Sequence, residues 1–185
     1  AFEYEIDLAS ELMKMTEMSA NKQALITFLE KRYQAVSDFF KSWNLSKTSI
    51  KDAIQQTHSV EKLSEKALVD LKDFSKEMIR QYVNVPAQAI RELDSNHLNL
   101  GMRYAYLANE AMAAGSEFFD VFSINCYQED PTDKIDQVAK ITGLPVMIGE
   151  FHFGALDKGL TATGIKGCLT QKDRAQAFDY YFAKA

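Results

Sequence analysis

Three short apolar stretches of the chain are each followed by polar or aromatic residues. The stretches are His97–Arg103, Phe119–Cys126 and Pro145–Phe151, and each is predicted to be a strand. In parallel α/β proteins, the groups that bind ligands or react gather at the carboxyl ends of the strands. The candidates at these ends are Asn99, Arg103, Asn125, Tyr127, Glu150, His152 and Phe153. Such a set suits a polyhydroxylated ligand, with aromatic faces for stacking and a carboxylate for chemistry.

Glu150 is the strongest candidate for chemistry. It follows Met147-Ile148-Gly149, the end of a strand that we expect to be buried on both faces. Burying a carboxylate at such a position costs free energy unless it is paired with a cation or takes part in a reaction. Two other interpretations remain open, namely a solvated loop glutamate and a glutamate that is ion-paired with Arg103.

Several other kinds of site are disfavoured by spacing. Gly159 and Gly164 have the separation of a phosphate-binding loop, but Ile165 stands where the lysine is required. Glu150 and His152 could share a metal ion, but further ligands are not evident. A serine nucleophile would need a Gly-x-Ser-x-Gly elbow, which the sequence lacks. We therefore expect no metal and no cofactor.

The second half of the chain, residues 95–185, alternates strands with helices and predicts three βα units. Helices are expected over Tyr104–Gly115, where alanine is frequent, and from Asp130-Pro131 to Gly143. Thr170 and Asp173 resemble a capping box that begins a last helix ending near Ala183. Consecutive βα units imply parallel strands joined by right-handed crossovers.

The first half, residues 1–94, is predicted to be helical throughout. Leucines and methionines at positions 8, 12, 15 and 18 have helical spacing, and Asn21 is a suitable N-cap for a helix over Gln23–Arg32. Shorter helices are expected over residues 35–42 and from Ser49, followed by a long amphipathic helix over 61–93. We expect Pro86 to kink or break this last helix. Core packing accounts for these apolar stripes, and the whole chain of 185 residues is predicted to be a single domain.

Composition limits the classes of partner. The 21 basic and 26 acidic residues give 21 − 26 = −5, which argues against a nucleic-acid or anionic-membrane surface. No stretch is apolar for long enough to span a membrane. The cysteines, Cys126 and Cys168, could form one disulfide or remain two free thiols.

The three strand-end motifs resemble a known family. Asp94–Arg103, Phe119–Tyr127 and above all Gly149-Glu-Phe-His-Phe-Gly154 are similar to successive strands of the clan-A glycoside hydrolases, in particular the β-agarase group of family fifty. Phe28–Tyr33 and Phe39–Trp43 resemble the helical insertion that follows the fourth strand of these enzymes. The resemblance implies a partial eight-stranded (β/α)8 TIM barrel, from about strand four or five to strand seven, preceded by a long helical segment.

The resemblance also implies roles for individual residues. Glu150 corresponds to the nucleophile of a retaining glycosidase, and Tyr127 to the residue that orients it. The residues that would bind sugar are His97, Asn99, Arg103, Asn125, His152 and Phe153. The implied substrate is a β-linked oligosaccharide or polysaccharide, which would place the protein outside the cell or in the periplasm.

The sequence departs from this family in two respects. The family's acid/base glutamate follows an asparagine, but Asn109-Glu110 lies within a predicted helix and is set aside for that reason. Glu5 is the remaining candidate, although Tyr4 precedes it. The chain is also shorter than a barrel of about 200 residues or more, so we expect a fragment of a larger catalytic domain. Its open strand edges favour a homodimer or a missing barrel half as partner. A non-catalytic module that binds carbohydrate or protein is the alternative.

Overall fold

The computed structural model describes residues 7–107 and 109–185. Contacts within the chain divide it into two compact units, Ala1–Tyr82 and Val83–Ala185. We call them the helical unit and the α/β unit, and the division falls inside the longest helix, α5 (Glu65–Leu93). The expectation of a single domain stays a prediction.

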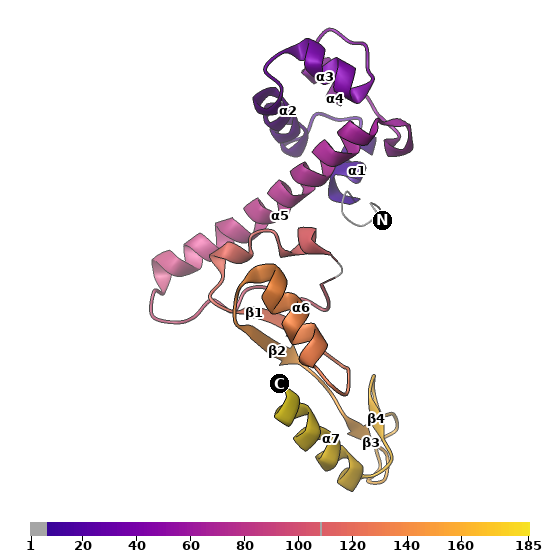
Figure 1. Ribbon diagram of the computed structural model, residues 1–185, viewed down its shortest axis with the longest axis vertical. Helices are drawn as coiled ribbons and strands as arrows, with labels where there is room; N and C mark the ends of the chain where they lie inside the picture. Colours follow the sequence, from indigo (N-terminus) through magenta and orange to yellow (C-terminus); the bar gives the residue numbers. More distant parts are fainter. Residues whose placement is uncertain (1–6, 108) are drawn as a thin grey trace. The chain divides into compact units, whose positions relative to one another are not determined.

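The described part of the helical unit is built of α-helices and a 3-10 turn (Figure 1). Its elements are α1 (Asp7–Lys14), α2 (Ala20–Arg32), α3 (Val36–Trp43), α4 (Ile50–Gln55), the 3-10 turn η1 (Val60–Lys62) and the first part of α5. The fully buried side chains at its centre are those of Met13, Leu25, Ile26, Leu29, Phe39, Trp43, Ile54 and Leu71. The helical prediction for this half is confirmed.

Serine side chains determine where two of these helices begin. Ser19 accepts a hydrogen bond from the amide of Lys22 at 3.2 Å, and Ser49 accepts one from the amide of Asp52 at 3.0 Å. These are N-cap bonds, which satisfy amides that have no partner within the helix. Helix α2 therefore begins at Ala20, and the prediction of Asn21 as its cap is wrong.

Helix α5 continues through Pro86 as one element. Of the kink or break expected there, the break is wrong and the kink stays a prediction. A proline inside a helix removes one main-chain donor and crowds the preceding turn. Pro86 is exposed, so water can reach the carbonyl group that loses its partner.

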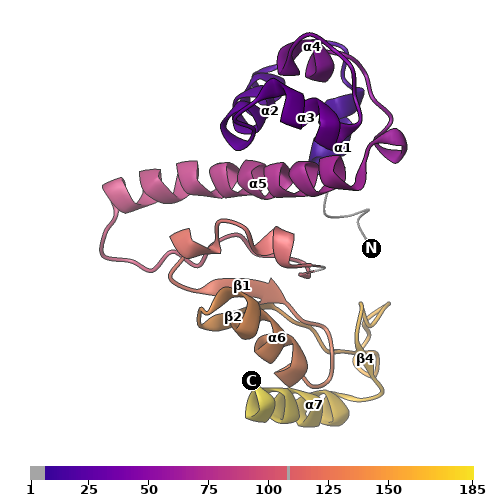
Figure 2. The ribbon, with the colours of Figure 1, turned by 45° about the horizontal axis from the view of Figure 1, so that its top comes forward.

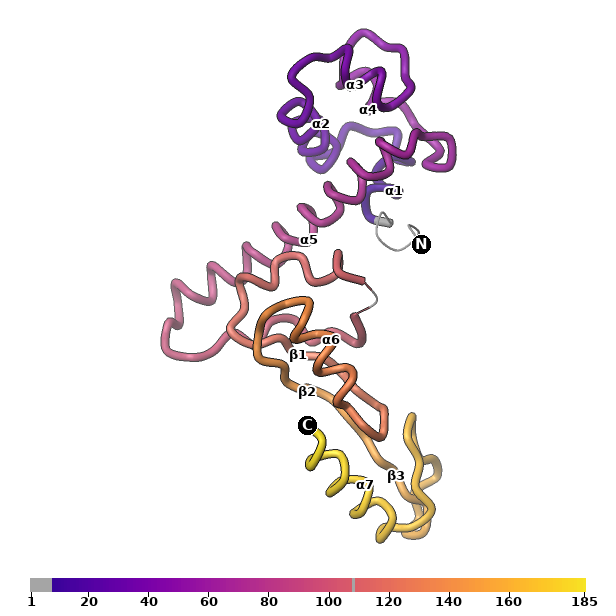
Figure 3. Tube along the Cα trace, in the orientation of Figure 1, coloured from indigo at the N-terminus to yellow at the C-terminus, as the bar shows by residue number. Residues whose placement is uncertain are grey.

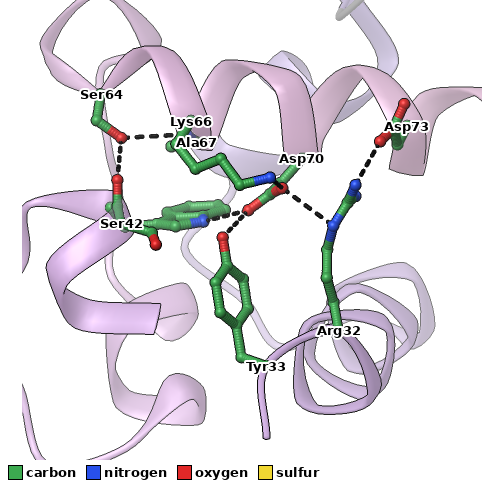
Figure 4. A network of polar contacts seen from close by, with 9 residues as sticks. Arg32, Tyr33, Ser42, Ser64, Lys66, Ala67, Asp70 and Asp73 are labelled. Carbon is green, nitrogen blue, oxygen red and sulfur yellow. Dashed lines mark hydrogen bonds and ion pairs between the residues drawn. The ribbon is translucent and has the colours of Figure 1, made fainter. Parts of the chain in front are cut away.

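A buried carboxylate joins three helices of the helical unit (Figure 4). Asp70, on α5, is fully buried and accepts hydrogen bonds from the hydroxyl of Tyr33 at 2.5 Å and the indole of Trp43 at 2.8 Å. Its other oxygen pairs with Lys66 at 3.1 Å and with Arg32 at 3.3 Å. Burial, followed by the bond to Asp70, raises the pKa of Tyr33 to about 12. The charge of Asp70 is thus compensated on all sides, which a buried carboxylate requires.

Lys22 is a second buried charged residue of the helical unit. Its ammonium group donates to the carbonyl oxygens of Met15 at 2.5 Å and Gln55 at 3.5 Å. The carbonyl of Met15 directly follows α1, and that of Gln55 belongs to the last residue of α4. Both therefore lie at the C-terminal end of a helix, where the helix dipole favours a cation. Burial lowers the pKa of Lys22.

The α/β unit is built on two parallel strands, β1 (Phe122–Asn125) and β2 (Val146–Glu150), joined through helix α6 (Thr132–Thr142). Figure 2 shows the two strands side by side, and α6 contacts β2. Phe122 pairs with Val146 and Ile124 with Ile148. Gly143 ends α6 in a left-handed conformation (φ +70°), the usual use of glycine at this position. The second and third predicted βα units are therefore confirmed in outline.

The first predicted βα unit is wrong in detail. Residues 97–103 form no regular strand. The main-chain amides of Asp120 and Val121 donate to the carbonyl oxygen of Asn99, and Tyr104, directly after this stretch, forms a parallel bridge with Ile124. The helix expected over 104–115 is replaced by two 3-10 turns, η2 (Glu110–Ala113) and η3 (Ser116–Phe118). Asn109 caps η2 from an extended conformation, and Gly115 has a φ of +88°. An extended residue at 109 and a left-handed residue at 115 both interrupt an α-helix, even in a segment that is rich in alanine.

Strand β2 is more open than we expected. Its residues alternate between half-buried and exposed, and Met147 and Gly149 are the exposed ones. In the described part of the chain β2 has only β1 as a neighbour, so the expectation of burial on both faces is wrong. The physical reason is that one edge and part of one face of the strand are uncovered.

The chain then continues through residues 151–170 to the last helix, a path that can be followed in Figure 3. Two-residue strands, β3 (Gly154–Ala155) and β4 (Gly167–Cys168), pair in parallel, and α7 (Gln171–Lys184) follows. The predicted capping box is confirmed, because Thr170 and Asp173 each bind the other's main-chain amide. Cys126 and Cys168 are both free thiols.

Candidate functional site

The C-terminal ends of β1 and β2 bring two of the predicted site residues together. Asn125 pairs with Glu150 across the parallel ladder, after an irregularity that follows Ile124. The amide of Cys126 donates to the carbonyl oxygen of Glu150 at 2.9 Å, which extends the pairing past the end of β1. Asn125 and Glu150 therefore lie at the same end of the sheet, as the motifs predicted.

The carboxylate of Glu150 forms an ion pair with Arg103. The Nη2 atom of Arg103 lies 3.1 Å from Oε2 of Glu150. The Glu150 side chain is 37% exposed and that of Arg103 is 59% exposed, so solvent reaches both partners. Ion pairs this exposed contribute little to folding stability. Of the interpretations left open by the sequence, pairing with Arg103 is the one that the structure shows.

Gly149 makes this ion pair sterically possible. A Cβ atom at Gly149 would lie 3.2 Å from Cδ of Arg103 and 3.3 Å from its Cγ. It would also lie 2.5 Å from the hydroxyl oxygen of Ser123 on the neighbouring strand. The aliphatic stem of Arg103 thus crosses the main chain directly before Glu150, where a larger residue would displace it.

Tyr127 follows the end of β1 but lies beside helix α6. It lines a cavity of about 170 Å³ together with Asn125 and residues of α6 such as Lys134 and Val138. In the described part of the chain it makes no polar contact with Glu150, so its orienting role stays a prediction. Oδ1 of Asn125 is buried and accepts no hydrogen bond from any described residue.

His97 and Asn99 are engaged in local turns. Nδ1 of His97 lies 2.7 Å from the carboxylate of Asp94. The main-chain amide of Asn99 donates to Asp120 at 2.7 Å, and its side-chain oxygen accepts from the amide of Gly101 at 2.9 Å. The structure therefore gives both residues a role in shaping residues 94–101, and sugar contacts by them stay predictions.

Phe153 differs from the expectation of a sugar-stacking surface. It is only 5% exposed and packs edge-on against Tyr181 of α7, at 5.7 Å between ring centroids. Phe151 stacks on the same tyrosine at 4.8 Å. The Tyr181 hydroxyl donates to the carbonyl oxygen of Cys126 at 3.0 Å, and burial raises the pKa of Tyr181. In this structure Phe153 serves the packing of α7, and its sugar-binding role stays a prediction.

His152 is exposed and closes the loop that precedes α7. Its Nε2 atom lies 2.5 Å from the carbonyl oxygen of Thr163. Gly164, at φ +75°, passes so close that a Cβ atom there would lie 2.4 Å from the same nitrogen. The His152 side chain therefore contacts the loop at Thr163 and Gly164. Its sugar-binding role stays a prediction.

Tyr104 is a residue that the sequence analysis missed. It is buried, stacks on Phe122 at 4.7 Å, and bridges to Ile124 of β1. Its hydroxyl is buried without a partner among the described residues, and burial raises its pKa to about 12. Tyr104 directly follows the predicted strand 97–103, so extending that strand by one residue would have included it.

The predicted acid/base, Glu5, lies outside the described residues. The reason for setting Glu110 aside was wrong, because Asn109 caps a 3-10 turn and Glu110 begins it, with no α-helix there. Among the described residues no group of three or more possible metal ligands occurs, and no helix is long and apolar enough to cross a membrane. A cavity of about 1070 Å³ lies in the helical unit, lined by residues of α2 and α5.

Comparison of the sequence with known proteins finds two β-agarases. The chain is 30% identical to β-agarase B of Vibrio sp. (strain JT0107) over 167 residues, which is 88% of this chain and 17% of that protein. It is 32% identical to β-agarase A of the same organism over 167 residues, or 85% of this chain and 16% of that protein. The chain thus spans about a sixth of the length of these relatives. No family model matches it.

Comparison of the structure gives the same group of proteins. The crystal structure of an agarase, AgWH50C, superposes with a TM-score of 0.84 at 25% identity, covering 100% of this chain and 26% of that one. An exo-β-agarase superposes equally well at 24% identity and shows the same fold over a quarter of its chain. The expected resemblance is therefore confirmed: the chain is homologous to one part of the β-agarases of glycoside hydrolase family fifty.

Proposed function

We propose that the chain is part of the catalytic region of a retaining β-agarase, with Glu150 as the nucleophile. The observation that carries the proposal is the position of Glu150. It ends β2 beside the end of β1, is partly open to solvent, and belongs to a chain homologous to β-agarases. Agar-type β-linked galactan is the corresponding substrate.

The partial barrel belongs to this proposal. Tyr104, β1 and β2 lie in parallel in the order of the chain, and α6 connects the two strands. Parallel strands joined by helices are the repeating unit of a (β/α)8 barrel, whose reacting groups lie at the carboxyl ends of the strands. We assign these three segments to successive barrel positions, with the remaining strands supplied by chain outside residues 1–185 or by a second polypeptide.

The chemistry would take place in two displacements. An oxygen of Glu150 attacks the anomeric carbon while the bond from that carbon to the leaving oxygen breaks, and an acid protonates the leaving oxygen. Water, deprotonated by the same group, then attacks the anomeric carbon and releases Glu150. We keep Glu5 as the proposed acid/base. In retaining enzymes the two carboxyl groups are about 5 Å apart.

An activated probe tests Glu150 without requiring the acid/base. A fluorinated β-galactoside with a dinitrophenyl leaving group forms a stable glycosyl ester, since dinitrophenolate departs without a proton. Mass spectrometry of peptides should find this ester on Glu150, and Glu150→Gln should abolish it. Glu129→Gln is the matched control, because Glu129 is also ion-paired, with Lys166 at 2.7 Å. An ester on another carboxylate, or none, would contradict the proposal.

A non-catalytic carbohydrate-binding module is the second candidate. The ion pair with Arg103 favours it, because it accounts for the carboxylate of Glu150 without any reaction. This candidate predicts binding of agaro-oligosaccharides in a calorimeter, equal in the wild type and Glu150→Gln, with no glycosyl ester on either.

A further inference from the structure

We infer that Arg103 is a positioning residue that holds the Glu150 carboxylate in one orientation, and that the glycine at 149 leaves room for the stem of Arg103 to cross beside it. The inference rests on the proposed function, since it assigns the group that orients the proposed nucleophile. It also changes the role of Arg103, which the sequence suggested as a sugar-binding residue.

The first support is the ion pair itself. Nη2 of Arg103 lies 3.1 Å from Oε2 of Glu150. Both side chains are partly exposed, so the pair lies where a ligand can reach the carboxylate. A guanidinium this close to a carboxylate favours one orientation of the carboxylate over others.

The second support is the steric requirement at Gly149. The stem of Arg103 lies 3.2 and 3.3 Å from the position that a Cβ of residue 149 would occupy. Contacts of this length require the neighbouring group to move by a few tenths of an ångström. Because residue 149 directly precedes Glu150, that movement would change the angle at which the guanidinium reaches the carboxylate.

The third support is the fixed base of the Arg103 side chain. The next residue, Tyr104, donates its amide to the carbonyl oxygen of Ser123 at 3.0 Å and accepts from the amide of Asn125 at 2.8 Å. Its ring stacks on Phe122. The main chain beside Arg103 is therefore held against β1, while the guanidinium remains accessible to solvent. A side chain whose main chain is fixed can orient a neighbouring group.

The test compares the rate at which the fluorinated dinitrophenyl β-galactoside labels Glu150 in a series of variants. Arg103→Met keeps most of the stem but removes the guanidinium, and should slow labelling about 10- to 100-fold. Arg103→Lys should retain part of the rate, since it keeps the charge but not the fork. In Arg103→Ala, added guanidinium ion should restore part of the rate, an effect that a merely structural role would not produce.

Arg91→Met is the matched control, because Arg91 is also paired with a carboxylate in the α/β unit, Asp120, at 3.1 Å. It should label at the wild-type rate. Equal labelling of the wild type and Arg103→Met would overturn the inference while leaving the proposed function intact. A wild-type chain that never forms the ester on Glu150 would instead overturn the proposed function, and the inference with it.

The glycine is tested in a background that removes its other close neighbour. In Ser123→Ala, the hydroxyl that would clash with a Cβ at 149 is gone and the contact with Arg103 remains. Adding Gly149→Ala there should slow labelling about tenfold. The same addition should have no effect once Arg103→Ala is also present. A tenfold loss that persists without Arg103 would contradict the role given to Gly149.

A readout independent of labelling is the carboxylate carbon resonance of Glu150 in NMR spectra. Arg103→Met should shift it, and Arg91→Met should not. An unchanged resonance in Arg103→Met would show that the two groups do not interact in solution and would overturn the inference whatever the labelling rates.

Discussion

The two units of the chain satisfy their buried polar groups to different degrees. In the helical unit, the buried carboxylate of Asp70 has four partners, and the buried ammonium of Lys22 has two. In the α/β unit, the hydroxyl of Tyr104 and the side-chain oxygen of Asn125 are buried without partners among the described residues. Unsatisfied buried polar atoms are rare in proteins and often mark functional places. The difference indicates that the described part of the helical unit satisfies its buried charges within its own fold, whereas the α/β unit leaves some buried polar atoms without a protein partner among the described residues.

Of the changes considered, removing the Asp70 carboxylate should have the largest effect on stability. Asp70→Ala leaves the indole of Trp43 and the hydroxyl of Tyr33 buried without an acceptor, and frees two cations from their pair. We expect the free energy of unfolding of the helical unit to fall by about 4 kcal/mol. Trp43 is the only tryptophan of the chain, so its fluorescence during urea unfolding reports on this unit alone.

Asp73→Ala provides the control for that measurement. Asp73 also pairs with Arg32, but its side chain is 36% exposed. Its loss should cost less than about 1 kcal/mol, as for most surface ion pairs. Equal losses in the two variants would mean that the Asp70 network is no more important than a surface contact.

Truncating Phe153 should affect the α/β unit by a smaller amount. Phe153→Ala removes a buried ring that contacts Phe151 and Tyr181, and we expect a loss of about 3 kcal/mol. Hydrogen exchange should become faster in α7 and β2, while the Trp43 unfolding curve stays unchanged. Leu169→Ala, at a side chain that is 85% exposed, is the control and should change neither. A shift of the Trp43 curve in Phe153→Ala would show that the two units unfold together.

Acid should produce the smallest effect, confined to the turn around Asn99. The hydrogen bond from the main-chain amide of Asn99, followed by that from Arg91, lowers the pKa of Asp120. A carboxyl group with a lowered folded-state pKa stabilises the fold above its unfolded pKa, near 4, and loses this contribution as the pH falls further. Exchange of the Asn99 amide should therefore accelerate between pH 5 and pH 2, beyond its intrinsic pH dependence. Asp120→Asn should remove the extra acceleration, and its persistence there would exclude Asp120 as the cause.

The elements that the sequence predicted well are those with local signals. Helix α7 has its capping box, α6 has its terminal glycine, and the apolar run of β2 ends in Glu150. The family motif at residues 149–154 and its position at the end of a strand were also predictable. These features depend on neighbouring residues in the sequence, so no knowledge of tertiary contacts was needed.

The region from 94 to 115 was predicted poorly because side chains there replace main-chain partners. Asp94 accepts from the amides of Asn96 and His97, and Asn99 accepts from that of Gly101. Such bonds compete with regular secondary structure, so alternating apolar residues gave turns where a strand was expected. The burial of Phe153 was not predictable for another reason, because it joins residues whose distance in space depends on the whole α/β unit. The pairing of Arg103 with Glu150 was one of the interpretations that the sequence left open, but the sequence alone could not select it.

The short pairing of β3 with β4 has a consequence for how the protein can vary. Gly154 donates its amide to Lys166 at 2.9 Å, and a Cβ at Gly154 would lie only 2.0 Å from the carbonyl oxygen of Thr163. The segment between these strands is thereby closed at its base, and the cost of closing a longer loop grows only slowly with its length. Insertions around Lys158–Leu160 should therefore be tolerated without disturbing β2 or α7. This turn is a natural place for evolution to add residues, or for an engineer to attach an affinity tag.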